Sequence, residues 1–293
     1  MPKGLKIISE SCFVGCSSLK EITLPEGLEE IEWRAFSYSG LESIVIPDSV
    51  KKLNGFSFCK KLKTVTIGRG VQEIGESTSK VSLGETKGGY TAVYANFNVA
   101  PGAFSGCTAL TTVIGGDNVG KIGDEAFENC TSLTNISIGK KLQVVGNSAF
   151  KGCTSLTTFT MDNNLKKDIG SEAFKGCKKL TTVTIGDNLI SIGGSAFEEC
   201  EALTTVSIGD NLKSIGSFAF SKCRTLITVT IGKGIKEMGD GAFSYCSSLT
   251  TFNIGSTESV NYSCYRTYVF EGCSSLSLKT KARIMETGYK GQF

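Results

Sequence analysis

The hydrophobic pattern along the chain repeats about every 23 residues. One clear copy spans residues 180–200, LTTVTIGDNLISIGGSAFEEC, and the next begins at Leu203. Each copy combines an alternating apolar segment, a Gly-containing turn, a second apolar pair and an Ala-Phe turn that ends in Cys. A period of this length is typical of solenoids, in which each repeat forms one turn of a coil and stacks on its neighbours.

The first segment of each repeat reads LxxVxI, as in residues 62–67 and 226–231. Apolar and polar residues alternate there, and the β-branched side chains predict a short strand. One strand from every turn would build a parallel sheet along one face of the solenoid. The Ala-Phe segment has the spacing of a tight helical or 3₁₀ turn, which we expect on the opposite side.

Three columns of residues define the turns. A Phe marks each turn, which predicts about eleven turns: Phe13, Phe36, Phe56, Phe104, Phe127, Phe150, Phe174, Phe197, Phe220, Phe243 and Phe270. A small residue, usually Ala, precedes most of these Phe residues, and a Cys follows three residues after ten of them. A column restricted to small side chains indicates close backbone approach in a packed core.

Two stretches, IGDEAFENCTSLTNISI (residues 122–138) and IGSEAFKGCKKLTTVTI (residues 169–185), resemble the BspA-like, or Treponema pallidum-type, leucine-rich repeats. The resemblance covers essentially the whole chain. It implies an α/β repeat protein: a right-handed leucine-rich-repeat solenoid with a parallel sheet on one face. It also implies a bacterial cell-surface or secreted protein, an adhesin or antigen that contacts host matrix or other cells.

We expect residues 1–293 to form a single domain with two interruptions, at residues 76–101 and 256–268. Residues 277–293 are expected to cap the last turn, as the ends of solenoids require. Leu278, Ala282 and Met285 would share the helical face that covers the core, and Gly288 would end the helix.

Two columns of hydroxyl side chains should face outward from the predicted sheet, two and four places after the first Leu. Their best-formed members are Thr158, Thr160, Thr182, Thr184, Thr205, Ser207, Thr228 and Thr230. One interpretation is an uncharged surface for a protein or glycan ligand. A second is an ice-binding Thr array, and a third is that Thr is simply well suited to exposed strand positions.

The two interruptions carry aromatic residues that are candidates for partner contacts. They are Tyr90, Tyr94 and Phe97 in the first interruption and Tyr262, Tyr265 and Tyr268 in the second. The alternative is that these rings fold back over the nearby core.

Twelve Cys and no His occur in the chain. Cys spacings near 23 match no zinc motif, and identical positions on stacked turns suit disulfide torsions poorly. We therefore expect a ladder of buried free thiols that includes Cys16 and Cys12, with Cys264 as the most exposed thiol.

Composition excludes several function classes. Without His, the common Ser-His and Cys-His nucleophiles cannot form, and no phosphate-binding Gly motif is present, so we expect no enzyme and no cofactor. An Asp column at the turns that includes Asp187 and Asp210 is ordinary turn chemistry, so we expect no metal. A net charge of +3 without a basic stripe argues against nucleic-acid binding.

No membrane span or signal peptide is visible in the sequence, and we expect a monomer. The sequence therefore predicts a non-enzymatic protein-binding module. A purely structural repeat segment of a larger surface protein remains an alternative.

Overall fold

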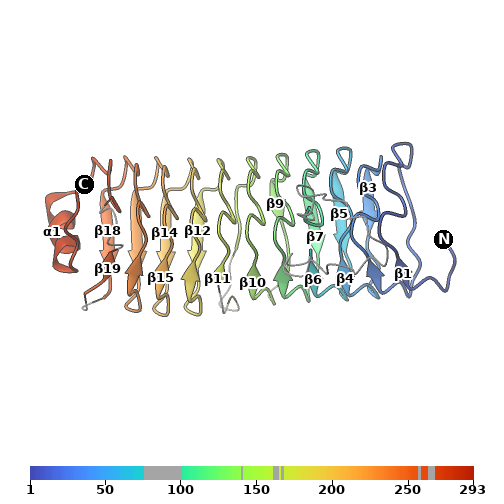
Figure 1. Ribbon diagram of the computed structural model, residues 1–293, viewed down its shortest axis with the longest axis horizontal. Helices are drawn as coiled ribbons and strands as arrows, with labels where there is room; N and C mark the ends of the chain where they lie inside the picture. Colours follow the sequence, from blue (N-terminus) through green and yellow to red (C-terminus); the bar gives the residue numbers. More distant parts are fainter. Residues whose placement is uncertain (76–100, 140, 161–164, 166–167, 257–258, 263–267) are drawn as a thin grey trace, which may run out of the picture.

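The turns of the chain stack into one elongated array, with the N-terminus at one end and the only helix of the described residues at the other (Figure 1). The structure is a computed structural model that describes residues 1–75, 101–139, 141–160, 165, 168–256, 259–262 and 268–293. This architecture confirms the predicted leucine-rich-repeat solenoid.

The LxxVxI segments form parallel strands, as predicted. They assemble into two four-stranded sheets: β3 (Ser43–Val45), β5 (Thr64–Ile67), β7 (Thr112–Gly115) and β9 (Asn135–Ile136), then β12 (Thr182–Ile185), β14 (Thr205–Ile208), β16 (Thr228–Ile231) and β18 (Thr251–Ile254). Along each strand, the Val and Ile positions are buried and the alternate positions face outward, for example in β14. The two sheets lie along the same side of the array, which we call the strand face.

A longer sheet of two-residue strands forms from the second apolar pair of each turn, and the repeat pattern did not predict it. Its eleven strands are β1 (Ile7–Ile8), β2 (Glu30–Ile31), β4 (Lys52–Leu53), β6 (Glu73–Ile74), β8 (Lys121–Ile122), β10 (Val144–Val145), β11 (Asp168–Ile169), β13 (Ser191–Ile192), β15 (Ser214–Ile215), β17 (Glu237–Met238) and β19 (Asn261–Tyr262). Two residues are too few to show an alternating pattern, so only pairing with adjacent turns reveals these strands.

The Ala-Phe segments form hydrogen-bonded turns and do not extend into helices. Glu125 and Asn129 show why, because their φ angles are 54° and 56°, in the left-handed region. The residues two places before and two places after most of the Phe residues share this conformation, which interrupts right-handed helix on both sides. It also directs N–H groups toward the next turn: Phe127 N–H donates to the Ala149 carbonyl at 2.8 Å.

The Phe column forms the centre of the hydrophobic core. From Phe13 to Phe270, consecutive rings stack with centroids 5.0 to 5.8 Å apart and planes within 12° of parallel. All of these rings except Phe13 are fully buried. The stack therefore connects the turns through one continuous core.

A helix packs on the last turn near the C-terminus, but its buried face is not the one expected from the sequence. Helix α1 (Leu278–Glu286) begins after Ser277, whose hydroxyl accepts a hydrogen bond from Thr280 N–H at 3.1 Å. Leu278 and Met285 are 87% and 58% exposed, whereas Ile284 is fully buried. Ile284 directly precedes Met285, so its side chain points about 100° around the helix from that of Met285.

Aromatic residues after α1 close the Phe column. The Tyr289 ring packs edge-on against Phe270 at 5.2 Å, and the Phe293 ring stacks on Phe270 at 6.0 Å. The backbone of Phe270 also hydrogen-bonds to the Tyr289 hydroxyl, and that hydroxyl donates to the Gln292 carbonyl at 2.6 Å. Burial of the phenol raises the pKa of Tyr289 to about 12. The tail thus supplies both apolar cover and a hydrogen-bond partner to the last turn.

Two neighbouring substitutions in α1 test this orientation. Ile284→Asp places a carboxylate in the buried contact and should lower the free energy of unfolding by about 3 kcal/mol or more. Met285→Asp, on the exposed face, should change it by less than about 0.5 kcal/mol. Urea unfolding followed by circular dichroism measures both. Equal effects of the two substitutions would contradict the observed face.

Candidate functional site

The strand face carries the predicted hydroxyl columns in register. Thr182 pairs with Thr205, Thr205 with Thr228, and Thr228 with Thr251 across the second four-stranded sheet. The other column passes in the same way from Thr184 through Ser207 and Thr230 to Asn253. The side chains of Thr158, Thr160, Thr182, Thr205, Ser207 and Thr230 are exposed, that of Thr228 is half-buried, and that of Thr184 lies outside the described part of the structure.

A third Thr column lies beside these two and was not predicted. It occupies the position directly after the first Leu, and each hydroxyl donates to the carbonyl of the same position in the preceding turn. Thr134 donates to the Thr111 carbonyl, Thr157 to the Thr134 carbonyl and Thr204 to the Thr181 carbonyl, each at 3.2 Å. The hydroxyls of this third column are used within the fold. In the outward columns, those of Thr112 and Thr251 hydrogen-bond to Thr111 and Thr250.

Charge distinguishes the strand face from the eleven-stranded sheet. In the second four-stranded sheet, the outward columns contain only Thr, Ser and Asn. The outward positions of the other sheet include the alternating row Glu30, Lys52, Glu73 and Lys121, in which each residue pairs with the next. Lys121 forms an ion pair with Glu73. A partner of neutral polar character therefore matches the strand face best.

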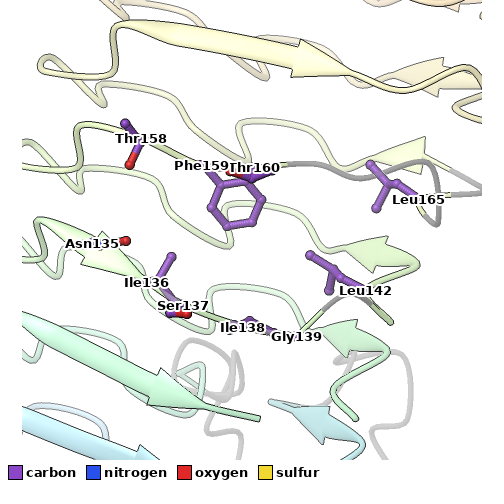
Figure 2. A pocket seen from close by; sticks show the side chains of 10 residues that line it. All are labelled: Asn135, Ile136, Ser137, Ile138, Gly139, Leu142, Thr158, Phe159, Thr160 and Leu165. Carbon is purple, nitrogen blue, oxygen red and sulfur yellow. The ribbon is translucent and has the colours of Figure 1, made fainter. Parts of the chain in front are cut away.

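The strand face is interrupted by an opening between β9 and residues 158–160 (Figure 2). The cavity there has a volume of about 340 Å³. Its floor consists of apolar side chains, and its rim of small polar ones. The floor residues are Ile136, Ile138, Leu142, Phe159 and Leu165, and the rim residues are Asn135, Ser137, Thr158 and Thr160.

The backbone ladder is broken at this opening. One turn earlier, Ser137 N–H donates to the Val113 carbonyl at 3.0 Å. The equivalent bond would join Thr160 N–H to the Ile136 carbonyl, and it is missing among the hydrogen bonds of the described residues. On its other side, residue 158 forms only an isolated bridge, to Thr182. The two four-stranded sheets are therefore separated at this point.

The repeat columns, the stacked turns and the parallel sheets agree with a comparison against family models. The model of the BspA type leucine-rich repeat region matches residues 1–82, 96–168 and 167–289, in six copies. The chain belongs to the BspA-type leucine-rich repeat family. This confirms the resemblance seen in the sequence. A comparison with curated proteins finds no match.

Two solved structures resemble this BspA-type protein. A leucine-rich repeat protein from Bacteroides ovatus is 24% identical, with a TM-score of 0.64, covering 100% of this chain and 76% of that chain. A leucine-rich repeat protein from T. pallidum is 23% identical, with a TM-score of 0.53, covering 86% of this chain and 91% of that chain. Identities at this level establish the fold.

Of the six aromatic candidates in the BspA-type protein, the structure describes Tyr262 and Tyr268. Tyr90, Tyr94, Phe97 and Tyr265 lie outside the described residues. Tyr268 is described and is 40% exposed, so it remains a candidate for partner contacts. Tyr262 makes contacts within the protein instead: its ring packs edge-on against Tyr289 at 5.1 Å, and its hydroxyl hydrogen-bonds to Thr287. Burial raises the pKa of Tyr262, consistent with a role in the cap.

The Cys column supplies hydrogen bonds between turns. Each buried thiol of the ladder donates to the backbone carbonyl of the Phe in the preceding turn, as Cys130 does to Phe104 at 3.2 Å and Cys153 to Phe127 at 3.1 Å. In the second turn Ser39 takes the Cys position and hydrogen-bonds to the Cys59 thiol at 3.3 Å. The sequence predicted small buried hydrophobic residues, and the structure adds this donor role.

Burial makes most of these thiols unreactive. Desolvation raises the pKa of Cys153 and Cys223 to about 12 and raises that of Cys130, Cys177 and Cys200 well above the usual value. Because the thiolate is the nucleophile, these groups are protected by protonation as well as by lack of access. Cys59 differs in direction, because its interactions with the neighbouring Cys107 and Ser39 side chains lower its pKa, but Cys59 is equally buried.

Cys12 and Cys16 correct the prediction that the whole ladder is buried. Both are exposed, because the structure places a neighbouring turn on only one side of them. Cys264 lies outside the described residues. A column thus predicts burial for turns that are covered on both sides, as Cys273 is in the last turn, and not for the first turn.

No group of three or more His, Cys, Asp or Glu side chains among the described residues could hold a metal ion. No helix among them is long and apolar enough to cross a bilayer.

Thiol labelling tests the two classes of Cys. In a Cys264→Ser background at pH 8, Ellman's reagent should react rapidly with Cys12 and Cys16 and with the nine buried thiols only after unfolding. The measurement is thiol release with and without guanidinium chloride. The control is Cys12→Ser/Cys16→Ser in the same background, which should show no rapid phase. A rapid phase in this control would show that the buried ladder is accessible.

Proposed function

We propose that this BspA-type protein is a non-enzymatic binding module and that its strand face binds a protein partner. The observation that carries the proposal is the pair of outward columns of Thr and Ser, in register over β12, β14 and β16 and free of charged residues. A sheet fixed by a stacked core offers such groups without further loss of backbone freedom, which favours binding.

The chemistry of the columns supports a protein surface as the partner. Hydroxyl groups donate and accept hydrogen bonds, so they can match backbone and side-chain groups of many geometries. Neutral polar surfaces of this kind are found around apolar anchor sites in protein interfaces. The opening between β9 and residues 158–160 supplies an apolar site of that kind within the same face.

We further propose that the protein acts outside the cell, as a surface or secreted adhesin that contacts host matrix or other cells. Membership of the BspA-type family supports this location. The buried thiols are compatible with it, because protonated, inaccessible Cys residues resist oxidation.

A second candidate function is ice binding, which the in-register Thr columns favour. The columns are interrupted at the opening beside β9, and Ser207 and Asn253 replace Thr in the second column. An extended lattice match would be broken at each of these places. A thermal hysteresis measurement distinguishes this candidate, because a binding module should show none.

Charged substitutions on the two faces test the binding surface. Thr205→Glu/Thr230→Glu places two carboxylates on the strand face, and capture from solubilised basement-membrane extract should fall by about tenfold or more. The matched control is Ser191→Glu/Ser214→Glu on the eleven-stranded sheet, which should keep capture within about twofold of the parent chain. Capture is measured by quantitative mass spectrometry of a pull-down, after circular dichroism has confirmed equal folding. Equal losses from both pairs would argue against the strand face.

Location can be measured directly. An antibody raised against the purified chain should label intact cells of the source bacterium or detect the protein in culture supernatant. Signal found only after cell lysis would contradict the extracellular assignment. Such a result would favour a structural or intracellular role for the repeats.

A further inference from the structure

The opening in the strand face combines two kinds of group that seldom occur together on a sheet. The ring of Phe159 and the side chain of Ile136 are 7% and 9% exposed, and Ile138 and Leu142 are half-buried. These apolar groups lie below the level of the hydroxyl columns, and none of the described residues that line the cavity carries an ionisable side chain. Figure 2 shows Phe159 and Leu142 reaching toward the space between the two turns.

Backbone groups accompany this apolar floor. Thr160 N–H and the Ile136 carbonyl lie on opposite sides of the opening, and no backbone hydrogen bond joins them. The N–H is a donor and the carbonyl an acceptor, so the C=O and N–H groups of a peptide backbone can pair with both. An extended peptide binds other proteins through such main-chain bonds, with pockets that receive alternate side chains.

A peptide side chain fits the cavity better than a sugar. Sugar rings stack on exposed aromatic faces, but Phe159 is held between Phe150 and Phe174, with centroids 5.0 Å away on each side. The cavity of about 340 Å³ lies at the lower end of the range for ligand sites and has room for one large apolar side chain.

We propose that the opening between β9 and residues 158–160 binds one aliphatic or aromatic side chain from an extended segment of the partner. This inference rests on the proposed function and specifies it, because it makes the opening the anchor site and the hydroxyl columns the surrounding surface. The rim residue Ser137 then controls access to the pocket.

The test is methyl NMR of the full chain labelled at Ile and Leu. The probes are N-acetyl-leucine methylamide, N-acetyl-serine methylamide and N-acetylglucosamine. The leucine probe should shift the methyl signals of Ile136, Ile138 and Leu142 in a saturable manner. The same probe should leave Ile208 and Ile231 unchanged, because they hold the Ile138 position in regular turns. The serine probe should have no effect.

A matched pair of variants tests the pocket itself. Ser137→Phe fills the mouth and should abolish the shifts, whereas Ser207→Phe, at the same position of β14, should preserve them. Should Ser137→Phe fail to fold, Ser137→Leu makes the same test with a smaller side chain. No saturable shift with the leucine probe, or shifts with N-acetylglucosamine alone, would overturn the inference.

The outcome can be separated from that of the proposed function. If Thr205→Glu/Thr230→Glu reduces partner capture but Ser137→Phe does not, the strand face binds its partner without this pocket. If neither Thr205→Glu/Thr230→Glu nor Ser137→Phe affects capture while the leucine probe still binds, the pocket is real but the partner uses another surface.

Discussion

The structure depends on one constraint: the backbone groups of each turn must find their partners in the turns on either side. A single turn is too short to satisfy its own N–H and C=O groups, and buried groups without partners are costly. Identical positions must therefore coincide from turn to turn. Three sets of hydrogen bonds meet this requirement: the parallel ladders of both strand sets, the backbone bonds between successive Ala-Phe turns, and the bonds from Cys thiols to Phe carbonyls.

The same constraint explains why Phe and Cys occur in fixed columns. Stacked Phe rings keep a spacing of about 5 Å, close to the strand spacing of a sheet, so core and backbone repeat together. A Cys side chain is small enough for the crowded interior and still donates a weak hydrogen bond. At the Cys position of the second turn, the Ser39 hydroxyl hydrogen-bonds to the Cys59 thiol of the next turn.

Much of this fold could be predicted from the sequence, because periodic residues report periodic contacts. The buried Leu, Val and Phe columns, the strands, the outward Thr residues and the cap helix all followed from spacing. The eleven-stranded sheet could not be predicted from spacing, because each of its strands has only two residues. The buried face of α1 could not be predicted from spacing either. Leu278 and Met285 are conspicuous apolar residues, but Ile284 is the buried one, and Tyr289 and Phe293 pack on Phe270.

The candidate site was harder to predict because it is a departure from the repeat. Phe159 in place of Val is not sufficient to cause the opening, because Phe252 occupies the same position of β18 and still pairs regularly with Val229. The turn with Phe159 and the turn with Phe252 differ at the position three residues after the Phe.

In most turns this position is Gly, and at several of these glycines an added Cβ would collide with the preceding turn. Such a Cβ at Gly139 would lie 2.4 Å from the Asp117 Cα, and at Gly209 it would lie 2.5 Å from the Asp187 Cα. In the sequence of the seventh turn, Asp162 holds this position. The sequence therefore departs from the Gly column in the same turn at which the ladder between the two four-stranded sheets is interrupted. The opening in the strand face and this departure from the repeat coincide, so a broken column in a repeat sequence indicates where such a face is interrupted only when the residue is read against the whole column and not against the single turn.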